Sequence, residues 1–219
     1  MELPTQLNSL DVKHFGNNFY FTEKNPVNML ALIDLLNRLY ERGFYRRLHF
    51  SVPEVKQQLS EQLLSLRGLE KLTINKFTQC YALPALKHLK ELNIFDCTDA
   101  DQMEPMAIGL VNLERLFLQR ASNSHMLPFI RYSIKLKHLK ILSTESANFQ
   151  GDVINLQKLN RERAKLFGAR KIVIYIEDNI FLATKWSSRY GDTDLKMIEM
   201  KRSNAICWDF DYSTVRTLH

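Results

Sequence analysis

The sequence predicts an α/β fold in which about seven to eight parallel strands alternate with helical or irregular connectors. Two observations support this prediction. Apolar residues recur with a spacing of 3, 3 and 2 positions, and similar lengths of chain separate the recurrences. The recurrences are Leu66, Leu69, Leu72, Ile74; Leu86, Leu89, Leu92, Ile94; Leu110, Leu113, Leu116, Leu118; Leu136, Leu139, Leu142, Thr144; Leu166, Ala169, Ile172, Ile174; with shorter versions at Tyr45, Leu48, Phe50 and Leu195, Ile198, Met200.

The last two positions of each recurrence are two residues apart, which is the spacing at which strand side chains share one face. The preceding steps of three lead the chain in from a helix or a turn. Successive last positions are 24, 20, 24, 26, 30 and 26 residues apart. Repetition at such a period predicts units that stack side by side, because one unit cannot bury its own apolar face.

The chain of 219 residues is expected to form a single domain. Residues 1–41 are predicted to be an N-terminal strand and helix cap, in which the first strand is either an extended first repeat or part of the cap. The repeats follow over residues 42–203. Residues 204–219, in which large aromatic residues alternate with polar ones, are predicted to cover the C-terminal end of the sheet.

The connectors are predicted to differ in length. Asn25-Pro26 is a typical helix start, and Gly43 is expected to end that helix. The connector at 77–84 is short and predicts a turn or 3₁₀ piece. The longest predicted helix is 151–167, with Lys158, Arg161, Arg163 and Lys165 facing outward. Further helical connectors are predicted within 53–64, 99–109, 123–133 and 179–185.

One unit carries a more specific motif. From Leu89 to Cys97 the sequence reads L-x-x-L-x-I-x-x-C. Together with the recurrences over residues 42–203, it resembles the leucine-rich repeat family, in the intracellular form, and is similar to the repeat region of F-box substrate receptors. The resemblance implies a curved solenoid, or horseshoe, with strands on its concave side. In F-box receptors the F-box recruits a ubiquitin ligase and the repeats hold the target; we find no F-box in this sequence.

Composition indicates an intracellular protein. No run of about 18 uncharged apolar residues occurs, so no membrane span is expected, and the N-terminus lacks the pattern of a secretory signal. The cysteines, Cys80, Cys97 and Cys207, are odd in number and widely spaced, which favours reduced thiols in the cytoplasm or nucleus. We expect a monomer.

No catalytic, cofactor or metal-binding constellation is predicted. The sequence has no glycine-rich phosphate loop, no C-x-x-C pair and no H-E-x-x-H motif. His88 and His138 occupy matching repeat positions. They are expected about 10 Å apart, at roughly 4.8 Å per strand, which is too far for one zinc ion with ligand bonds of about 2.0–2.3 Å.

A partner is expected to bind the concave strand face. Phe95 and Phe117 are predicted there as an exposed aromatic pair, which is typical of a binding hot spot; alternatively, they are ordinary cross-strand neighbours. A row of four basic residues is predicted to form a basic rim, or else a solvated stripe that Glu91 neutralises. The four are Arg47, Lys71, Arg115 and Lys171. The predicted partner-binding residues are Arg47, Lys71, Asn93, Phe95, Arg115, Phe117, Gln119, Lys171 and Tyr175.

Three functions are compatible with this surface. The first is a protein-interaction scaffold, which the resemblance narrows to the substrate-recognition part of a ubiquitin-ligase receptor. The second is an RNA or ribonucleoprotein component that uses the basic residues, since the formal net charge is +6; nucleic acid is the less favoured partner. The third is an enzyme regulator of the leucine-rich repeat type, which would present Arg120 or Arg131 on a loop.

Overall fold

The computed structural model describes residues 6–13, 29–55, 57–77, 82–97, 100–119, 121–142, 153–187 and 191–203. These residues form one eight-stranded sheet and six α-helices. The strands are β1 (Leu7–Lys13), β2 (Tyr45–Val55), β3 (Leu69–Phe77), β4 (Glu91–Cys97), β5 (Arg115–Gln119), β6 (His138–Leu142), β7 (Ile172–Ile176) and β8 (Ile198–Arg202). The helices are α1 (Met29–Glu41), α2 (Gln57–Leu63), α3 (Met103–Gly109), α4 (Asn123–Tyr132), α5 (Leu156–Ala164) and α6 (Asp178–Ser187), with a 3₁₀ turn η1 (Leu83–Ala85).

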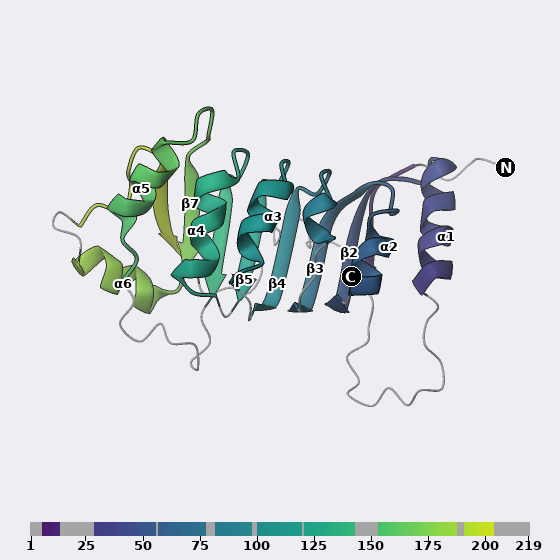
Figure 1. The fold of residues 1–219 in the computed structure, drawn as a ribbon, viewed down its shortest axis with the longest axis horizontal. Helices are drawn as coiled ribbons and strands as arrows, with labels where there is room; N and C mark the ends of the chain where they lie inside the picture. The colour runs from purple at the N-terminus through teal and green to yellow at the C-terminus, as the bar shows by residue number, and fades with distance from the viewer. Residues whose placement is uncertain are drawn as a thin grey trace, which may run out of the picture.

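The sheet is wholly parallel, and its strands lie in the order of the chain from β1 to β8. The helices cover one face of the sheet, and the structure describes no helix on the other face (Figure 1). We call this second face the helix-free face. The α/β class and the parallel pairing are therefore as the sequence predicts.

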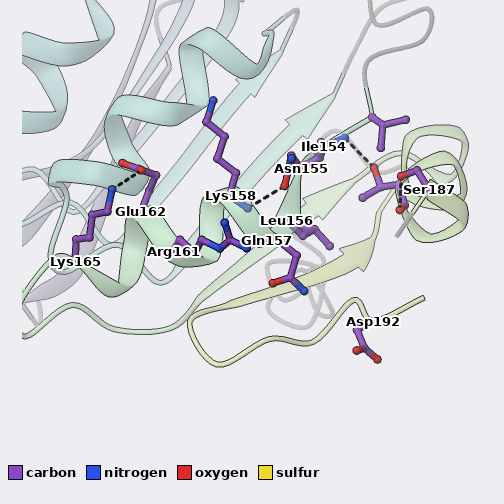
Figure 2. Close-up of a pocket in the computed structure, with 12 residues that line it drawn as sticks. Ile154, Asn155, Leu156, Gln157, Lys158, Arg161, Glu162, Lys165, Ser187 and Asp192 are labelled. Carbon is purple, nitrogen blue, oxygen red and sulfur yellow. Dashed lines mark hydrogen bonds and ion pairs between the residues drawn. The ribbon is translucent and has the colours of Figure 1, made fainter. Parts of the chain in front are cut away.

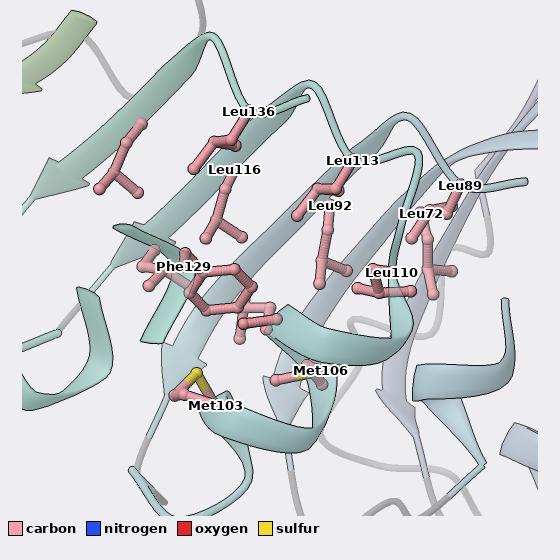
Figure 3. Packing of buried hydrophobic residues seen from close by; sticks show 14 of the residues in the cluster. Leu72, Leu89, Leu92, Met103, Met106, Leu110, Leu113, Leu116, Phe129 and Leu136 are labelled. Atoms are coloured by element: carbon pink, nitrogen blue, oxygen red, sulfur yellow. The ribbon is translucent and has the colours of Figure 1, made fainter. Parts of the chain in front are cut away.

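The core lies between the sheet and the helices. Leu72, Leu92 and Leu116 are direct neighbours on β3, β4 and β5, and all three are buried. Leucines that precede the strands form a second row beside them, and side chains of α3 and α4 pack against both rows (Figure 3). The repeated spacing therefore positions the core residues of the central strands correctly.

The predicted alignment is wrong at β6. Leu139, not Leu142, pairs with Leu116, and Ile141 pairs with Leu118. Ile141 is consequently part of the main core, whereas Leu142 belongs to a small separate cluster with Phe117. A displacement by an odd number of residues moves a strand side chain to the opposite face, so the predicted positions of Ile141 and Leu142 are exchanged. Thr144 lies outside the described residues.

At the two ends of the sheet the alignment differs by two residues. Phe50 pairs with Leu72, and Ile174 pairs with Leu139. Each of these partners lies one inward-facing position earlier along its strand than the partner that the predicted alignment gives. Because two residues are one full strand period, these shifts leave every side chain on its predicted face. β2 also contains an irregularity between Leu48 and His49.

The connectors largely match their predicted types, except that Pro53 and Val55 belong to β2 and not to the helix predicted within 53–64. The predicted helix start at Asn25-Pro26 lies outside the described residues. Leu7–Lys13 forms β1, parallel to β2, and α1 is followed by Gly43 with φ +71°. The short connector between β3 and β4 contains the 3₁₀ turn η1. The predicted C-terminal cap, residues 204–219, lies outside the described residues.

The helix predicted over 151–167 is much shorter than expected. The helix α5 begins after Asn155, whose side-chain Oδ1 accepts a hydrogen bond from the Lys158 N–H at 2.9 Å, and it has nine residues. The longest described helix is α1, with thirteen. The prediction that Arg163 faces outward is also wrong, because its side chain is completely buried.

The buried Arg163 guanidinium completes the hydrogen bonding of the neighbouring turn. Its nitrogens donate to five backbone carbonyls at 2.7–3.3 Å, which lie in the last turn of α4, in the turn before β6 and in the turn before β7. Carbonyls at a helix C-terminus have no partner within the helix, so this arginine supplies the missing donors. Burial lowers the pKa of the Arg163 guanidinium to about 10, so it remains charged at neutral pH. The accepting carbonyls belong to Ile130, Ser133, Ile134, Leu136 and Arg170.

Candidate functional site

Most of the predicted site residues come together on the helix-free face. Strand pairing aligns its side chains in rows that run across the sheet. The first row is His49, Lys71, Glu91, Arg115, His138 and Val173, and the second is Ser51, Thr73, Asn93, Phe117, Lys140 and Tyr175. The following positions on β5 and β6 are Gln119 and Leu142, which also pair.

Glu91 is the charged centre of the first row. Its Oε1 lies 2.9 Å from Lys71 Nζ, and its Oε2 forms an ion pair with Arg115. Asn93 Nδ2 donates a hydrogen bond to Glu91 Oε1 at 3.0 Å. The residue Glu91 is only 1% exposed. A carboxylate this deeply buried requires compensating charge, and two cations on the adjoining strands provide it.

Replacing Glu91 with glutamine is expected to lower the free energy of unfolding by about 1–3 kcal/mol, because Lys71 and Arg115 would lose their shared anion. The estimate is below that for a fully buried pair, since both cations keep some contact with solvent. Urea unfolding measures the change. Glu70→Gln is the matched control: Glu70 also contacts two cations, but at a more exposed position. Equal losses for the two variants would contradict the special role of Glu91.

An apolar centre lies beside this charged group. The rings of Phe95 and Phe117 meet edge to face with centroids 5.2 Å apart and an interplanar angle of 66°. Leu142 and Phe117 form a buried pair, and Phe95 and Tyr175 pack against it. The predicted aromatic pair on neighbouring strands is therefore present, and the leucine of β6 extends it.

The exposure predicted for this pair is wrong at Phe117, which is only 2% exposed. Leu142 is 4% exposed and Lys140 is 1% exposed, although both belong to the helix-free face. Phe95 and Tyr175 are half-buried. The middle of this face is thus far less accessible than its margins.

His138 is at the border between the charged and apolar parts. Its ring centroid lies 6.0 Å from that of Tyr175. Burial lowers the pKa of His138 below its ordinary value of 6.5, and the positive charges of Arg115 and Lys137 act in the same direction. The imidazole is therefore held mainly neutral at neutral pH, and it adds aromatic surface to the patch rather than charge.

The predicted basic row is wrong at both of its ends. His49, not Arg47, pairs with Lys71, while Arg47 lies 3.6 Å from Glu70 in an ion pair. Lys171 precedes β7 and forms an ion pair with Asp194. Only Lys71 and Arg115 of the predicted basic rim remain in one row, and Glu91 separates them.

Sequence reasoning missed Lys140 and Leu142 as members of this surface. Both were left out because the predicted alignment of β6 was wrong. The signal that could have found them is the polar–apolar alternation of His138, Leu139, Lys140 and Ile141, which is typical of a strand with one buried face. The fixed spacing of 3, 3 and 2 concealed it.

A separate cavity of about 960 Å³ lies between α5 and α6. Figure 2 shows its lining, which combines buried apolar side chains such as Leu156 with Lys158, Arg161 and Glu162. Glu162 accepts a hydrogen bond from Lys165 Nζ at 2.7 Å. The described lining includes no cysteine or histidine.

Metal-binding clusters and membrane spans are also absent from the part of the chain that the structure describes. No three His, Cys, Asp or Glu residues there are close enough together to hold a metal ion. No described helix combines the length and the apolar character needed to cross a bilayer. In comparisons with protein families, curated proteins and solved structures, the chain matches none.

Proposed function

We propose that the chain is a leucine-rich repeat solenoid that binds a protein partner through its helix-free face. The observation that carries the proposal is the eight-stranded parallel sheet whose strands follow one another in chain order, with helices described only on the opposite face. Stacked repeats of this kind expose an extended strand surface for recognition. At roughly 4.8 Å per strand, the surface suits one side of a protein interface of standard size.

The composition of the face supports a protein partner. Half-buried Phe95 and Tyr175 surround a desolvated centre, and charged residues lie beside it. Interface hot spots have this arrangement of aromatic and arginine side chains around a water-excluded centre. In addition, Asn93 Oδ1 is buried and accepts no hydrogen bond from the part of the chain that the structure describes. An unsatisfied buried acceptor costs about 1–3 kcal/mol, and a donor from a partner would recover that cost.

Among protein-binding roles, we favour the recognition part of an F-box-type ubiquitin-ligase receptor. The support is the resemblance carried by the motif from Leu89 to Cys97, and it concerns the repeats alone. The basic residues give less support to a nucleic-acid partner. Lys71 and Arg115 already contact Glu91, and Arg163 is engaged with backbone carbonyls, so these cations are poorly placed to neutralise phosphates.

Site-specific photo-crosslinking tests the proposed surface. A photoreactive amino acid at Gln119 or Tyr175 is expected to capture the same partner from native extract. The matched control is Ile108 on α3, which is exposed on the opposite, helical side. Capture of that partner from Ile108 but from neither strand position would assign binding to the helices and contradict the proposal.

A further inference from the structure

A surface separate from the helix-free face lies at the edge of the sheet where the strands begin. The loops that lead into β5, β6 and β7 lie next to one another there (Figure 1), because these strands are parallel and adjacent. We call this surface the strand-start edge and define it by residues 110–114, 133–137 and 165–171.

Each of the three loops exposes an apolar side chain. Val111 is 51% exposed, Ile134 is 45% exposed and Phe167 is 97% exposed. Single apolar residues are common on protein surfaces, but a row of them on adjoining loops forms a patch of the kind that marks a contact with a partner. The ring of Phe167 offers the largest apolar area of the row, so its burial would contribute most to binding.

The local backbone holds Phe167 in its exposed position. The Ala169 N–H donates a hydrogen bond to the Leu166 carbonyl at 3.1 Å, so Phe167 and Gly168 are the two central residues of a tight turn. Gly168 has φ +74°, a conformation that favours glycine. A Cβ added at Gly168 would meet no atom within 4 Å, so this turn projects from the rest of the fold.

Hydrogen bonds also fix the three loops relative to one another. Arg163 Nη2 donates to the Ile134 carbonyl at 3.1 Å, and Arg163 Nε donates to the Arg170 carbonyl at 3.0 Å. Lys135 Nζ donates to Asn112 Oδ1 at 2.5 Å, which joins the loop before β6 to the loop before β5. A surface fixed in this way loses little conformational entropy when it binds.

The strand-start edge is basic around its apolar side chains. Residues 133–137 and 165–171 contain no carboxylate, and their cations are Lys135, Lys137, Lys165, Arg170 and Lys171. Carboxylates outside these two loops form ion pairs with Lys137, Lys165 and Lys171. Lys135 and Arg170 are exposed and form no ion pair with a described carboxylate. The edge therefore keeps positive charge next to its apolar side chains.

We propose that the strand-start edge binds the surface of an anionic lipid bilayer, with Phe167 inserted among the lipids and Lys135 and Arg170 beside their phosphate groups. Apolar side chains that enter the boundary between headgroups and acyl chains, and cations that attract anionic lipids, together hold proteins at a membrane surface. Contact of this kind needs no membrane-spanning segment. It leaves the helix-free face accessible, so it does not depend on the proposed function.

A lipid surface fits these observations better than an acidic protein does. The central aromatic residue of a protein interface fills a pocket of the partner and is ringed by contacts that exclude water. Phe167 instead projects from a turn with 97% of its surface exposed, and the neighbouring apolar residues, Val111 and Ile134, differ from it in shape. A bilayer accepts such a row of unlike side chains without complementary pockets.

Sedimentation of the full chain with lipid vesicles tests the proposal. We expect the chain to sediment with vesicles of mixed phosphatidylcholine and phosphatidylserine, to stay in solution with pure phosphatidylcholine, and to dissociate as salt rises. Phe167→Ala is expected to weaken binding about tenfold or more, since it removes the inserted ring. Arg170→Glu reverses a charge at the lipid surface and is also expected to weaken binding about tenfold or more. Both side chains are exposed, so both variants should fold.

Two variants elsewhere are the matched controls. Trp186→Ala removes an aromatic side chain that is 84% exposed on α6, near the opposite edge of the sheet (Figure 1). Lys76→Glu reverses an exposed charge near the end of β3. Neither change is expected to weaken sedimentation with the anionic vesicles.

Two results would overturn the inference. A chain that stays in solution with vesicles containing phosphatidylserine does not bind anionic lipid, and the strand-start edge would then be left to an acidic protein. Losses of binding for Trp186→Ala and Lys76→Glu that equal those for Phe167→Ala and Arg170→Glu would show that the strand-start edge is not the site. Neither result changes the crosslinking pattern expected from the helix-free face, so this inference and the proposed function can fail separately.

Discussion

Replacing Arg163 with methionine is expected to lower the free energy of unfolding by ~3–5 kcal/mol, because several buried carbonyls would lose their donor at about 1–3 kcal/mol each. The guanidinium reaches five carbonyls that belong to the end of α4, the turn before β6 and the turn before β7. Methionine fills a similar volume without any donor. Against a typical total of about 5–15 kcal/mol, this loss would be visible as a large decrease in the urea midpoint.

Two further variants make the Arg163 prediction specific. Arg163→Lys keeps the charge but replaces the planar fork of donors by a single ammonium, so we expect a loss close to that of methionine. Arg161→Met, two residues earlier on α5, changes an exposed arginine and is expected to have an effect within about 0.5 kcal/mol. If Arg161→Met and Arg163→Met were equally destabilising, the network of carbonyls would not be the cause.

Replacing Leu116 with aspartate is expected to unfold the chain. Leu116 is fully buried between Leu92 and Leu139 in the middle of the sheet. An isolated carboxylate there would meet no compensating charge. The free-energy cost of burying it would exceed the free energy of unfolding of a typical domain. Leu116→Ala is expected to cost about 2–5 kcal/mol, so it should still fold. Circular dichroism and the cooperativity of thermal unfolding distinguish the two.

Val111→Asp is the matched control for Leu116→Asp. Val111 lies five residues earlier, in the turn after α3, and its side chain is exposed. The same charge should therefore have little effect there. A cooperative melt for Leu116→Asp would mean that the recurring leucines do not form the core.

The parts of the fold that local spacing could predict are those that depend on which face of a strand a residue occupies. Leu72, Leu92 and Leu116 are inward as predicted, and an error of two residues at Phe50 did no harm, since strand side chains repeat every two residues. The same logic fails for an odd displacement. At β6 the spacing assigned Leu142 to the core, where the structure has Ile141.

The candidate site was predictable in position but not in accessibility. Spacing placed Asn93, Phe95 and Phe117 on one face of adjoining strands, and the structure brings them together. The burial of Phe117 and Glu91 could not be predicted, because it depends on residues that are distant in the sequence, such as the cations that the neighbouring strands bring within reach of Glu91.

Arg163 shows the same division most clearly. Its sequence neighbours on α5 are polar and basic, and nothing local distinguishes it from Arg161. It is buried because α4 and the turns before β6 and β7 converge on it, and those carbonyls come from chain positions about thirty residues away. Periodic leucines set the α/β class and the inward faces, since those follow from neighbours within a few residues. Strand alignment, the burial of Phe117 and the buried arginine were settled by contacts between distant residues, which no local pattern records.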